Sequence, residues 1–250
     1  MPMKIIWTVL GLLGSVVGLF LLWVLLMGVL ALFIDPRKNY MHNSKMHRSL
    51  AKPVLYALNF LAGARIKASG TEKIPTDSRF LLICNHRSDF DPLVTWQVLW
   101  KYDLAFICKP PVFRIPIFGR IIRKLCFMPI NREDPREAMR TINHAASLIQ
   151  NDEVSLAVYP EGTRSKECRL LEFHSGVLKI AQKANVPVVV ATVQGTEKIC
   201  RSFPWRRSEI ELDVLEVIPA DRVKAERSTA LGDYARRLMA EKLGDDITEE

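Results

Sequence analysis

The sequence has few cysteines and no closely spaced pair of them. The five thiols stand at positions 84, 108, 126, 168 and 200 without a C-x-x-C motif, and three of them lie in apolar, strand-like runs. This arrangement predicts reduced, structural cysteines in a cytosolic domain. Cys84 lies beside a histidine-containing motif, but no base is placed to activate it as a nucleophile, so we assign it to the core of a strand.

A second absence is that of charge near the amino terminus. No charged residue occurs between Ile5 and Ile34, where Thr8, Ser15 and glycines are the interruptions in the apolar run. Thirty helical residues extend about 45 Å, which exceeds the roughly 30 Å hydrocarbon core of a bilayer. The run therefore predicts a membrane anchor: one tilted span, a helix broken near residues 11–14, or a membrane-embedded hairpin. Its length and the lack of a clear small-residue cleavage site argue against a cleaved signal peptide.

Positive charge is unevenly distributed around this run. Lys4 and the amino terminus precede it, whereas a larger basic group follows it: Arg37, Lys38, Lys45, Arg48 and Lys52. If the run crosses the bilayer once, the positive-inside rule places the C-terminal part on the cytoplasmic face of the cell membrane. The formal net charge of +8 favours contact with anionic lipid headgroups.

Beyond the anchor, strand-like and helical patterns alternate, with no internal repeat and no long linker. This alternation predicts an α/β fold with a mixed, largely parallel sheet flanked by helices, preceded by the N-terminal membrane-embedded helical segment. We divide the chain into an anchor over residues 1–36, an amphipathic membrane-proximal connection over 37–64, and a catalytic domain over 65–250. The connection's predicted apolar face comprises Val54, Leu55, Leu58, Leu61 and Ala62. Strands are expected at residues 65–69, 80–84, 104–108, 125–130, 154–159, 186–193 and 210–217.

Two Asp-Pro pairs mark predicted helix starts. Asp91-Pro92 and Asp134-Pro135 each combine an N-cap carboxylate with a proline that fits the first helical position. Apolar residues follow at helical spacing after both pairs. Further helices are expected after Gly176 and over residues 231–243.

The first Asp-Pro pair lies close to a histidine at the end of a predicted buried strand. His86 follows the apolar run 80–83 and precedes Asp91 by five positions. Five residues correspond to about 140° of rotation on a straight helix, so the two side chains meet only if the chain turns between them. Such a turn lets the carboxylate accept the imidazole N–H, which equips the pair to take a proton from a hydroxyl. A helix cap with a surface histidine is the structural alternative.

A second polar loop follows another predicted buried strand. Residues 159–164 read YPEGTR, in which the proline ends the strand and Gly162 permits close approach of a ligand. The planar guanidinium of Arg164 suits bidentate binding of phosphate. A polar turn with an ion pair between Glu161 and Arg164 is the alternative. Because both loops follow strands, we expect them to face each other at one edge of the sheet.

Cationic and apolar residues are interleaved in a third segment. Residues 109–120 read KPPVFRIPIFGR, and residues 129–132 read PINR. This composition suits a surface that contacts both headgroup phosphates and acyl chains. A basic, aromatic stripe also suits nucleic acid, but the membrane anchor favours lipid, and we expect no nucleic-acid partner. Residues 201–207, RSFPWRR, form a similar basic-aromatic loop.

Four blocks of the sequence together resemble the glycerolipid acyltransferases typified by bacterial 1-acyl-sn-glycerol-3-phosphate acyltransferase, the PlsC type. They are Asn85-His86 with Asp91, Phe118-Gly119 with Arg132, Glu161-Gly162-Thr163-Arg164, and Val186-Pro187-Val188. The resemblance extends over residues 65–195 and includes the lead-in GTEKIP at 70–75. It implies transfer of a fatty acyl group from acyl-CoA or acyl-carrier protein to the free sn-2 hydroxyl of 1-acyl-glycerol-3-phosphate. The product would be phosphatidic acid for phospholipid biosynthesis.

The resemblance also implies roles for individual residues. His86 is expected to be the base and Asp91 its partner, with no cofactor beyond the acyl donor and no metal. The residues expected to bind substrate or shape its site are Asn85, Lys109, Arg132, Glu161, Gly162, Thr163 and Arg164. Pro110-Pro111 follow Lys109 where family members have further polar residues including Glu, a departure that leaves the acceptor headgroup open.

Other functions fit parts of the same pattern. One is an acyltransferase for a different lysophospholipid. A membrane-anchored thioesterase or lysophospholipase would use the same dyad with water as acceptor. A non-catalytic lipid-binding scaffold would need His86 and Asp91 only as a turn. A metal site built from His86, Asp91, Glu161 and His174 is a further alternative, although these residues lack the close ligand spacing of zinc motifs.

Overall fold

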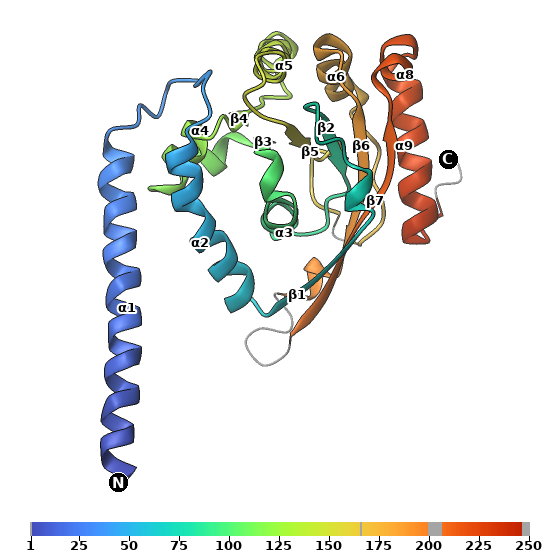
Figure 1. Ribbon diagram of the computed structural model, residues 1–250. Helices are drawn as coiled ribbons and strands as arrows, with labels where there is room; N and C mark the ends of the chain where they lie inside the picture. The colour runs from blue at the N-terminus through green and yellow to red at the C-terminus, as the bar shows by residue number, and fades with distance from the viewer. Residues whose placement is uncertain (1, 166, 200–206, 247–250) are drawn as a thin grey trace.

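A mixed β-sheet with helices on both faces forms the body of the computed structural model, which describes residues 2–165, 167–199 and 207–246 (Figure 1). The described residues form a seven-stranded sheet in the order β1-β7-β6-β2-β5-β3-β4. Neighbouring strands are parallel except β6 and β7. The strands are β1 (Ala64–Ser69), β2 (Leu81–Cys84), β3 (Ala105–Cys108), β4 (Met128–Pro129), β5 (Leu156–Val158), β6 (Val188–Gln194) and β7 (Ser208–Ile218). The predicted fold class is confirmed.

Helices and short 3-10 turns connect these strands. α2 packs on α3, while α5, α6 and α8 pack in succession on the other side of the sheet, where α9 covers β6 (Figure 1). The helices are α1 (Pro2–Leu32), α2 (Lys45–Leu61), α3 (Asp91–Val98), α4 (Phe118–Lys124), α5 (Pro135–Gln150), α6 (Lys179–Ala184), α8 (Ala220–Ala225) and α9 (Ser228–Leu243). The 3-10 turns are η1 (Thr71–Lys73), η2 (Trp100–Tyr102), η3 (Pro110–Arg114), η4 (Ser175–Leu178) and η5 (Thr196–Lys198).

Each strand coincides with a predicted apolar run, and the run at 125–130 is the one most shortened. It contributes only Met128–Pro129 to the sheet, because Leu125 ends α4 and Cys126 turns the chain at φ 65°. At Asp134 the predicted cap is confirmed, since its side chain accepts the N–H groups of Arg136 and Glu137. Cys200 and all but the last residue of the predicted basic-aromatic loop lie outside the described residues.

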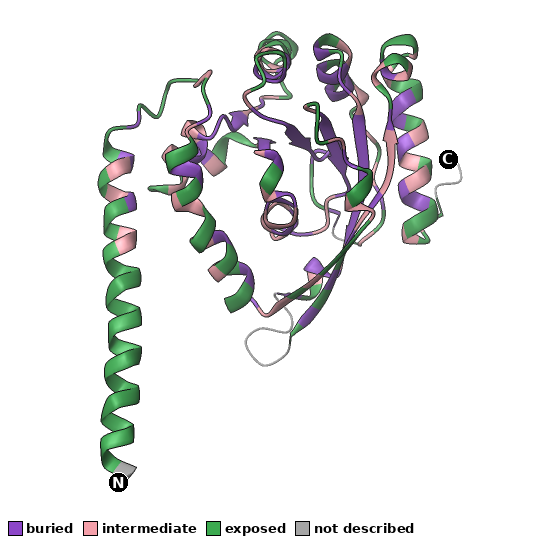
Figure 2. Cartoon of the chain, in the orientation of Figure 1, coloured by how far each residue is buried: buried purple, intermediate pink, exposed green. Residues whose placement is uncertain are grey.

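The N-terminal helix α1 is continuous from Pro2 to Leu32, without a break at residues 11–14 and without a hairpin. It has the length and composition needed to cross a membrane. Residues 3–22 are exposed, a stretch of about 30 Å in a helix, which matches a bilayer's hydrocarbon core. The remaining turns instead pack one side against the domain: Met27 and Ala31 are buried, as is Ile34 just after the helix (Figure 2). Arg120 donates to the Ala31 carbonyl at 3.2 Å.

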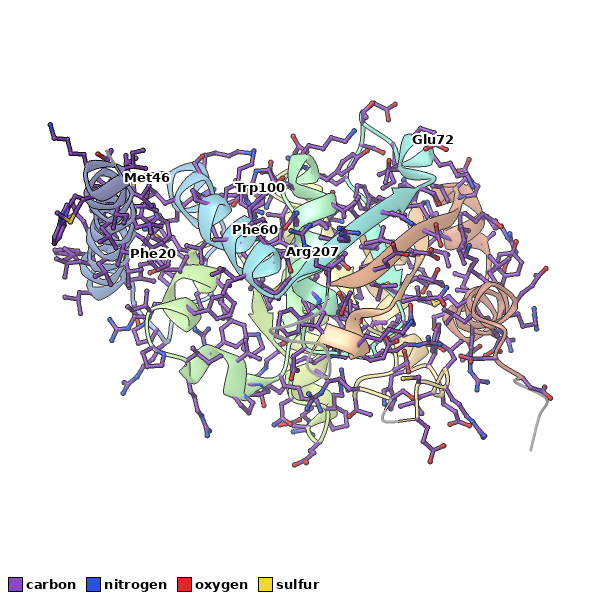
Figure 3. All side chains as sticks on the ribbon, turned by 90° about the horizontal axis from the view of Figure 1, so that it is seen from below. Phe20, Met46, Phe60, Glu72, Trp100 and Arg207 are labelled. Atoms are coloured by element: carbon purple, nitrogen blue, oxygen red, sulfur yellow. The ribbon has the colours of Figure 1, made fainter. Side chains whose placement is uncertain are left out.

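Helix α2 divides its apolar residues between the domain and the exterior. Leu55 and Ala62 are buried, whereas Leu58 is 44% exposed and Leu61 64% exposed. Phe60, at 76% exposure, projects from the same end of the helix (Figure 3). The predicted apolar face is therefore only partly a packing face. Its C-terminal end presents apolar side chains outward, as expected of a helix beside a membrane surface.

A buried arginine fastens α2 to the sheet. The Arg48 guanidinium donates to the carbonyls of Leu104 at 2.9 Å and Leu125 at 3.4 Å, and to Asn43 Oδ1 at 3.1 Å. Burial lowers the pKa of Arg48 to about 10, against the opposing effect of Asp103. The guanidinium therefore stays charged at neutral pH. Because it is buried and hydrogen-bonded inside the domain, it fixes α2 and is not available to a lipid headgroup.

Two partly buried histidines predict how stability depends on pH. Burial lowers the pKa values of His47 and His144 below the ordinary 6.5. The unfolded chain therefore binds protons at a higher pH than the folded chain does, so the free energy of unfolding should fall as the pH drops below about 6.5. Chemical denaturation in detergent between pH 7.5 and 5 would measure this. His144→Gln should make the slope shallower; an unchanged slope would contradict the assignment for His144.

Candidate active site

Four neighbouring strands place the predicted site residues at one edge of the sheet. β2, β5, β3 and β4 lie side by side in that order and run parallel. Their carboxyl ends therefore lie at the same edge, where α/β folds form their sites. His86 follows β2, Glu161 follows β5, Lys109 follows β3 and Arg132 follows β4. The two polar loops therefore converge as predicted, because they follow the neighbouring parallel strands β2 and β5.

His86 and Asp91 are in direct contact. His86 Nδ1 lies 2.8 Å from Asp91 Oδ2, with the histidine side chain 17% exposed and the carboxylate fully buried. The same oxygen accepts the backbone N–H groups of Arg87 at 2.6 Å and Ser88 at 2.7 Å, and Thr196 donates to the other oxygen. The carboxylate thereby closes the turn between the two residues. It also holds the imidazole with Nδ1 as donor, so that Nε2 is the basic nitrogen.

The predicted N-cap role of Asp91 is wrong by one residue. α3 begins at Asp91 itself, and the preceding Phe90 occupies the cap position without a side-chain hydrogen bond. The physical reason is that the Asp91 carboxylate turns back to the loop of residues 86–88, where it accepts three N–H groups including the imidazole. The alternative of a helix cap with a surface histidine does not describe this geometry.

The ring and backbone of His86 are fixed from several sides. Its imidazole stacks on Tyr159, with ring centroids 4.5 Å apart and planes at 26°. Its backbone N–H donates to Glu161 Oε1 at 2.6 Å, and its carbonyl accepts the Ser165 N–H at 2.9 Å. The loop after β5 therefore holds the loop after β2 by main-chain contacts as well as by the stacked ring. Such fixation is what a general base requires.

Glu161 and Asn85 are occupied by backbone groups. Glu161 is buried and accepts the N–H groups of His86 and of Leu171, the latter at 3.0 Å; burial raises the pKa of its carboxyl, against the effect of these two donors. Asn85 is also buried, and its amide donates to the Val193 carbonyl at 3.0 Å and accepts the Val193 N–H at 2.7 Å. Both side chains position the His86 loop.

Arg164 has a different partner from the one considered in the sequence. The alternative of a Glu161–Arg164 ion pair does not describe the structure, because Arg164 pairs with Asp89 at 2.5 Å. This pair is largely exposed and joins the two polar loops at their surface. Arg164 is not among the residues that line the adjacent cavity.

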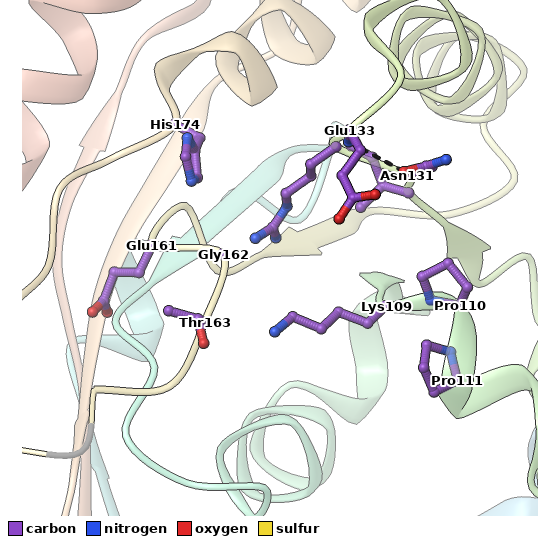
Figure 4. Close-up of a pocket in the computed structure, with 11 residues that line it drawn as sticks. Lys109, Pro110, Pro111, Asn131, Glu133, Glu161, Gly162, Thr163 and His174 are labelled. Atoms are coloured by element: carbon purple, nitrogen blue, oxygen red, sulfur yellow. Dashed lines mark hydrogen bonds between the residues drawn. The ribbon is translucent and has the colours of Figure 1, made fainter.

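A cavity of about 400 Å³ opens beside Glu161 and is lined by residues from the loops after β3, β4 and β5. Lys109 extends toward the Glu161–Thr163 loop (Figure 4), and Arg132 also lines the cavity. Partial burial lowers the pKa of Arg132, whose weakened hydration strengthens its attraction for an anion. The full lining is Lys109, Pro110, Pro111, Ile130, Asn131, Arg132, Glu133, Glu161, Gly162, Thr163 and His174.

Gly162 is the position where this cavity tolerates no side chain. It has φ +73°, and a Cβ there would lie 1.7 Å from Arg132 Nη1, 2.5 Å from Arg132 Cζ and 2.9 Å from His174 Cδ2. The Arg132 guanidinium therefore rests directly on the glycine backbone. This is the close approach that the glycine predicted, although the group that approaches is a side chain of the protein.

Sequence reasoning missed two polar residues of the cavity. Glu133 directly follows Arg132 but belongs to none of the four family blocks, and the sequence suggests His174 only as a metal ligand. His174 is tied to the site by its backbone N–H, which donates to the Pro160 carbonyl at 2.9 Å. Within the described ranges, no three His, Cys, Asp or Glu side chains are grouped as a metal site would require.

The sequence of the sheet and its loops matches a known family. Residues 65–194, just over half of the chain, match the family model described as Acyltransferase. The chain belongs to the acyltransferase family. The predicted resemblance is thereby confirmed, and the matched region contains the dyad and the whole cavity lining.

Relatives within this acyltransferase family come from plants and animals. The chain is 29% identical to the 1-acyl-sn-glycerol-3-phosphate acyltransferase BAT2, chloroplastic, of Brassica napus, covering 81% of this chain and 57% of that protein. It is 32% identical to LPAT1, chloroplastic, of Arabidopsis thaliana, covering 67% and 45%. The 1-acyl-sn-glycerol-3-phosphate acyltransferase alpha of Ovis aries is 26% identical, covering 87% and 75%. The chain thus spans about half the length of the two plant relatives.

The fold is shared with a solved acyltransferase. The crystal structure of the 1-acyl-sn-glycerophosphate (LPA) acyltransferase, PlsC, from Thermotoga maritima superposes with a TM-score of 0.63 at 24% identity. The match covers 80% of this chain and 83% of that one. It therefore extends beyond the region of the family model and shows a common fold for most of the chain.

Proposed function

We propose that this protein transfers a fatty acyl group from a thioester donor, acyl-CoA or acyl-carrier protein, to the sn-2 hydroxyl of 1-acyl-glycerol-3-phosphate. The observation that carries the proposal is the position of the His86–Asp91 pair beside the cavity. The His86 N–H donates to Glu161, and Glu161 lines the cavity together with the cations Lys109 and Arg132. The names of the relatives support the acceptor, since each of those cited is called a 1-acyl-sn-glycerol-3-phosphate acyltransferase.

The dyad supplies the proton chemistry. His86 Nε2 accepts the proton of the acceptor hydroxyl as its oxygen attacks the thioester carbonyl carbon, while buried Asp91 stabilises the imidazolium. The tetrahedral intermediate then collapses, the C–S bond breaks, and the departing thiolate takes the proton back from His86. Atoms and charge balance without an acyl-enzyme, a metal or a redox cofactor.

Lys109 and Arg132 are the proposed ligands of the acceptor phosphate. Both line the cavity: Lys109 extends toward the Glu161–Thr163 loop (Figure 4), and the Arg132 guanidinium lies against Gly162 of that loop. Arg164, in contrast, is paired with Asp89. Only two glycerol carbons separate the phosphate from the sn-2 hydroxyl. A phosphate held between two cations would therefore orient this hydroxyl toward the imidazole of His86. Thr163 lines the same space and offers a hydroxyl to the headgroup. The role of Arg164 in phosphate binding stays a prediction; in this structure its guanidinium is paired with Asp89.

We also propose that the domain lies on the cytoplasmic face of the cell membrane. The apolar helix α1 supports membrane attachment, and the basic residues that follow it support the orientation. Protease added to sealed right-side-out vesicles should then leave the domain intact, and digestion of the domain without detergent would contradict this orientation.

An acceptor panel tests the proposed reaction. The purified protein in lipid vesicles would be given labelled palmitoyl-CoA with lysophosphatidate, with another lysophospholipid, or with no acceptor, and the products separated by mass spectrometry. Phosphatidate formation that depends on lysophosphatidate supports the proposal. Preference for a different lysolipid would reassign the acceptor, and release of fatty acid at the same rate without any acceptor would identify a hydrolase.

A further inference from the structure

The C-terminal helix α9 lies outside the matched acyltransferase region, residues 65–194. It nevertheless contacts a segment that is hydrogen-bonded to the active-site loops. We name this segment, residues 170–174, the strap. Arg236 Nε donates to the Leu171 carbonyl at 3.1 Å, and Asp245 Oδ2 accepts the Leu170 N–H at 2.9 Å. Residues from and just beyond the helix therefore hold the strap along one side.

The other side of the strap holds the loop that carries Glu161. The Leu171 N–H donates to Glu161 Oε2 at 3.0 Å, and the His174 N–H donates to the Pro160 carbonyl at 2.9 Å. Glu161 Oε1 in turn accepts the His86 N–H. Leu171 thus has its carbonyl bound to α9 and its N–H bound to the residue that fixes His86. The chain of contacts from α9 to His86 is continuous.

Asp245 makes a second, more direct connection. Its Oδ2 lies 3.4 Å from Arg87 Nη2, in a pair whose side chains are 10% and 15% exposed. Arg87 is the neighbour of His86, and its N–H donates to Asp91. Gly244, at φ 70°, ends α9 and turns the chain so that Asp245 lies beside both Arg87 and Leu170. Sparse hydration makes this contact stronger than an exposed ion pair.

We propose that Asp245 and Arg236 are positioning residues of the active site, which hold His86 through the strap and through Arg87. The inference rests on the proposed role of His86 as the base. Neither residue touches substrate; each restrains the backbone that carries the reacting imidazole. Loss of this restraint should lower turnover much more than it weakens binding of the acceptor phosphate, because the two cations Lys109 and Arg132 come from the loops after β3 and β4 and not from the strap or the His86 loop.

The test compares Asp245→Ala with Asp213→Ala in the full-length protein in vesicles. Asp213 is a matched control, since it pairs with Lys242 of the same helix at 3.0 Å and is 14% exposed, but it connects α9 to β7. Asp245→Ala should lower kcat about 10- to 100-fold, with the KM for lysophosphatidate within about twofold. Asp245→Asn, which keeps an acceptor for the Leu170 N–H, should recover part of this loss. Asp213→Ala should leave kcat near the wild-type value.

Hydrogen exchange gives a readout that does not depend on activity. In Asp245→Ala, amides of residues 84–91 and 158–162 should exchange faster while those of β6 stay unchanged; Asp213→Ala should show neither change. Equal kcat values for the two alanine variants, or unaltered exchange at residues 84–91, would overturn the proposal. If the wild-type protein shows no acyl transfer at all, the proposed function fails, and the exchange comparison still decides whether α9 positions the loop.

Discussion

Replacement of His86 by glutamine should reduce acyl transfer by about 10²- to 10⁴-fold, the range that a positioned general base contributes. The amide occupies a similar volume and keeps a donor toward Asp91, but it offers no basic nitrogen to the acceptor hydroxyl. The melting temperature should stay close to wild type, because the backbone of residue 86 is held by Glu161 and Ser165 independently of the ring. Initial rates with labelled palmitoyl-CoA and lysophosphatidate measure the effect.

A matched histidine variant distinguishes chemistry from packing. His42→Gln alters an exposed histidine that pairs with Glu153, far along the chain from the dyad, and should leave turnover unchanged. If His86→Gln retained more than about a tenth of wild-type turnover, His86 would not be the base. Glu161, which already contacts this loop, would not then be an obvious substitute, because both of its oxygens accept backbone N–H groups.

Gly162→Ala should weaken binding of the acceptor strongly although it adds only one methyl group. The new Cβ would coincide with the guanidinium of Arg132, and the backbone at φ +73° disfavours any side chain. Arg132 must therefore leave its place on the loop, which removes one of the two cations proposed to hold the phosphate. We expect the KM for lysophosphatidate to rise by about tenfold or more, since a charge-assisted contact contributes about 1.5–3 kcal/mol.

Gly176→Ala provides the control for this substitution. It lies in the same stretch of chain, follows the cavity residue His174 by two positions, and has no heavy atom within 4 Å of the added Cβ. Its kinetic constants should match the wild type. Similar acceptor KM values for the two alanine variants would show that the Arg132–Gly162 contact does not matter for binding.

The inner strands β2, β3, β5 and β6 were predictable because they are short apolar runs buried on both faces. β2 and β6 read almost without polar residues, and the turns between strands carry proline, glycine and aspartate. Convergence of the polar loops followed from the same pattern, since parallel strands bring their carboxyl ends together. The family blocks then identified the residues at those ends.

What could not be predicted depends on long-range contacts. Glu161 and Arg164 are only three positions apart, which suggested an ion pair between them. The Glu161 carboxylate is instead buried, and it accepts two backbone N–H groups, those of His86 and Leu171. Arg87 and Asp245 are 158 positions apart, and no local pattern connects them. The one-residue error at Asp91 has a similar cause, because the carboxylate binds the loop before the helix instead of the helix's own N–H groups.

Helix α1 is continuous, but its two parts have different surroundings. Its first part is exposed and almost entirely apolar, whereas one side of its last turns is buried against the domain at Met27 and Ala31. A shortened protein that begins after this helix would therefore lack part of the domain's buried apolar core. It would uncover the surface that Met27 and Ala31 cover and remove the carbonyls of Ala31 and Leu32 to which Arg120 donates. Truncations intended to improve solubility should be cut before Trp23, so that the docked turns are kept.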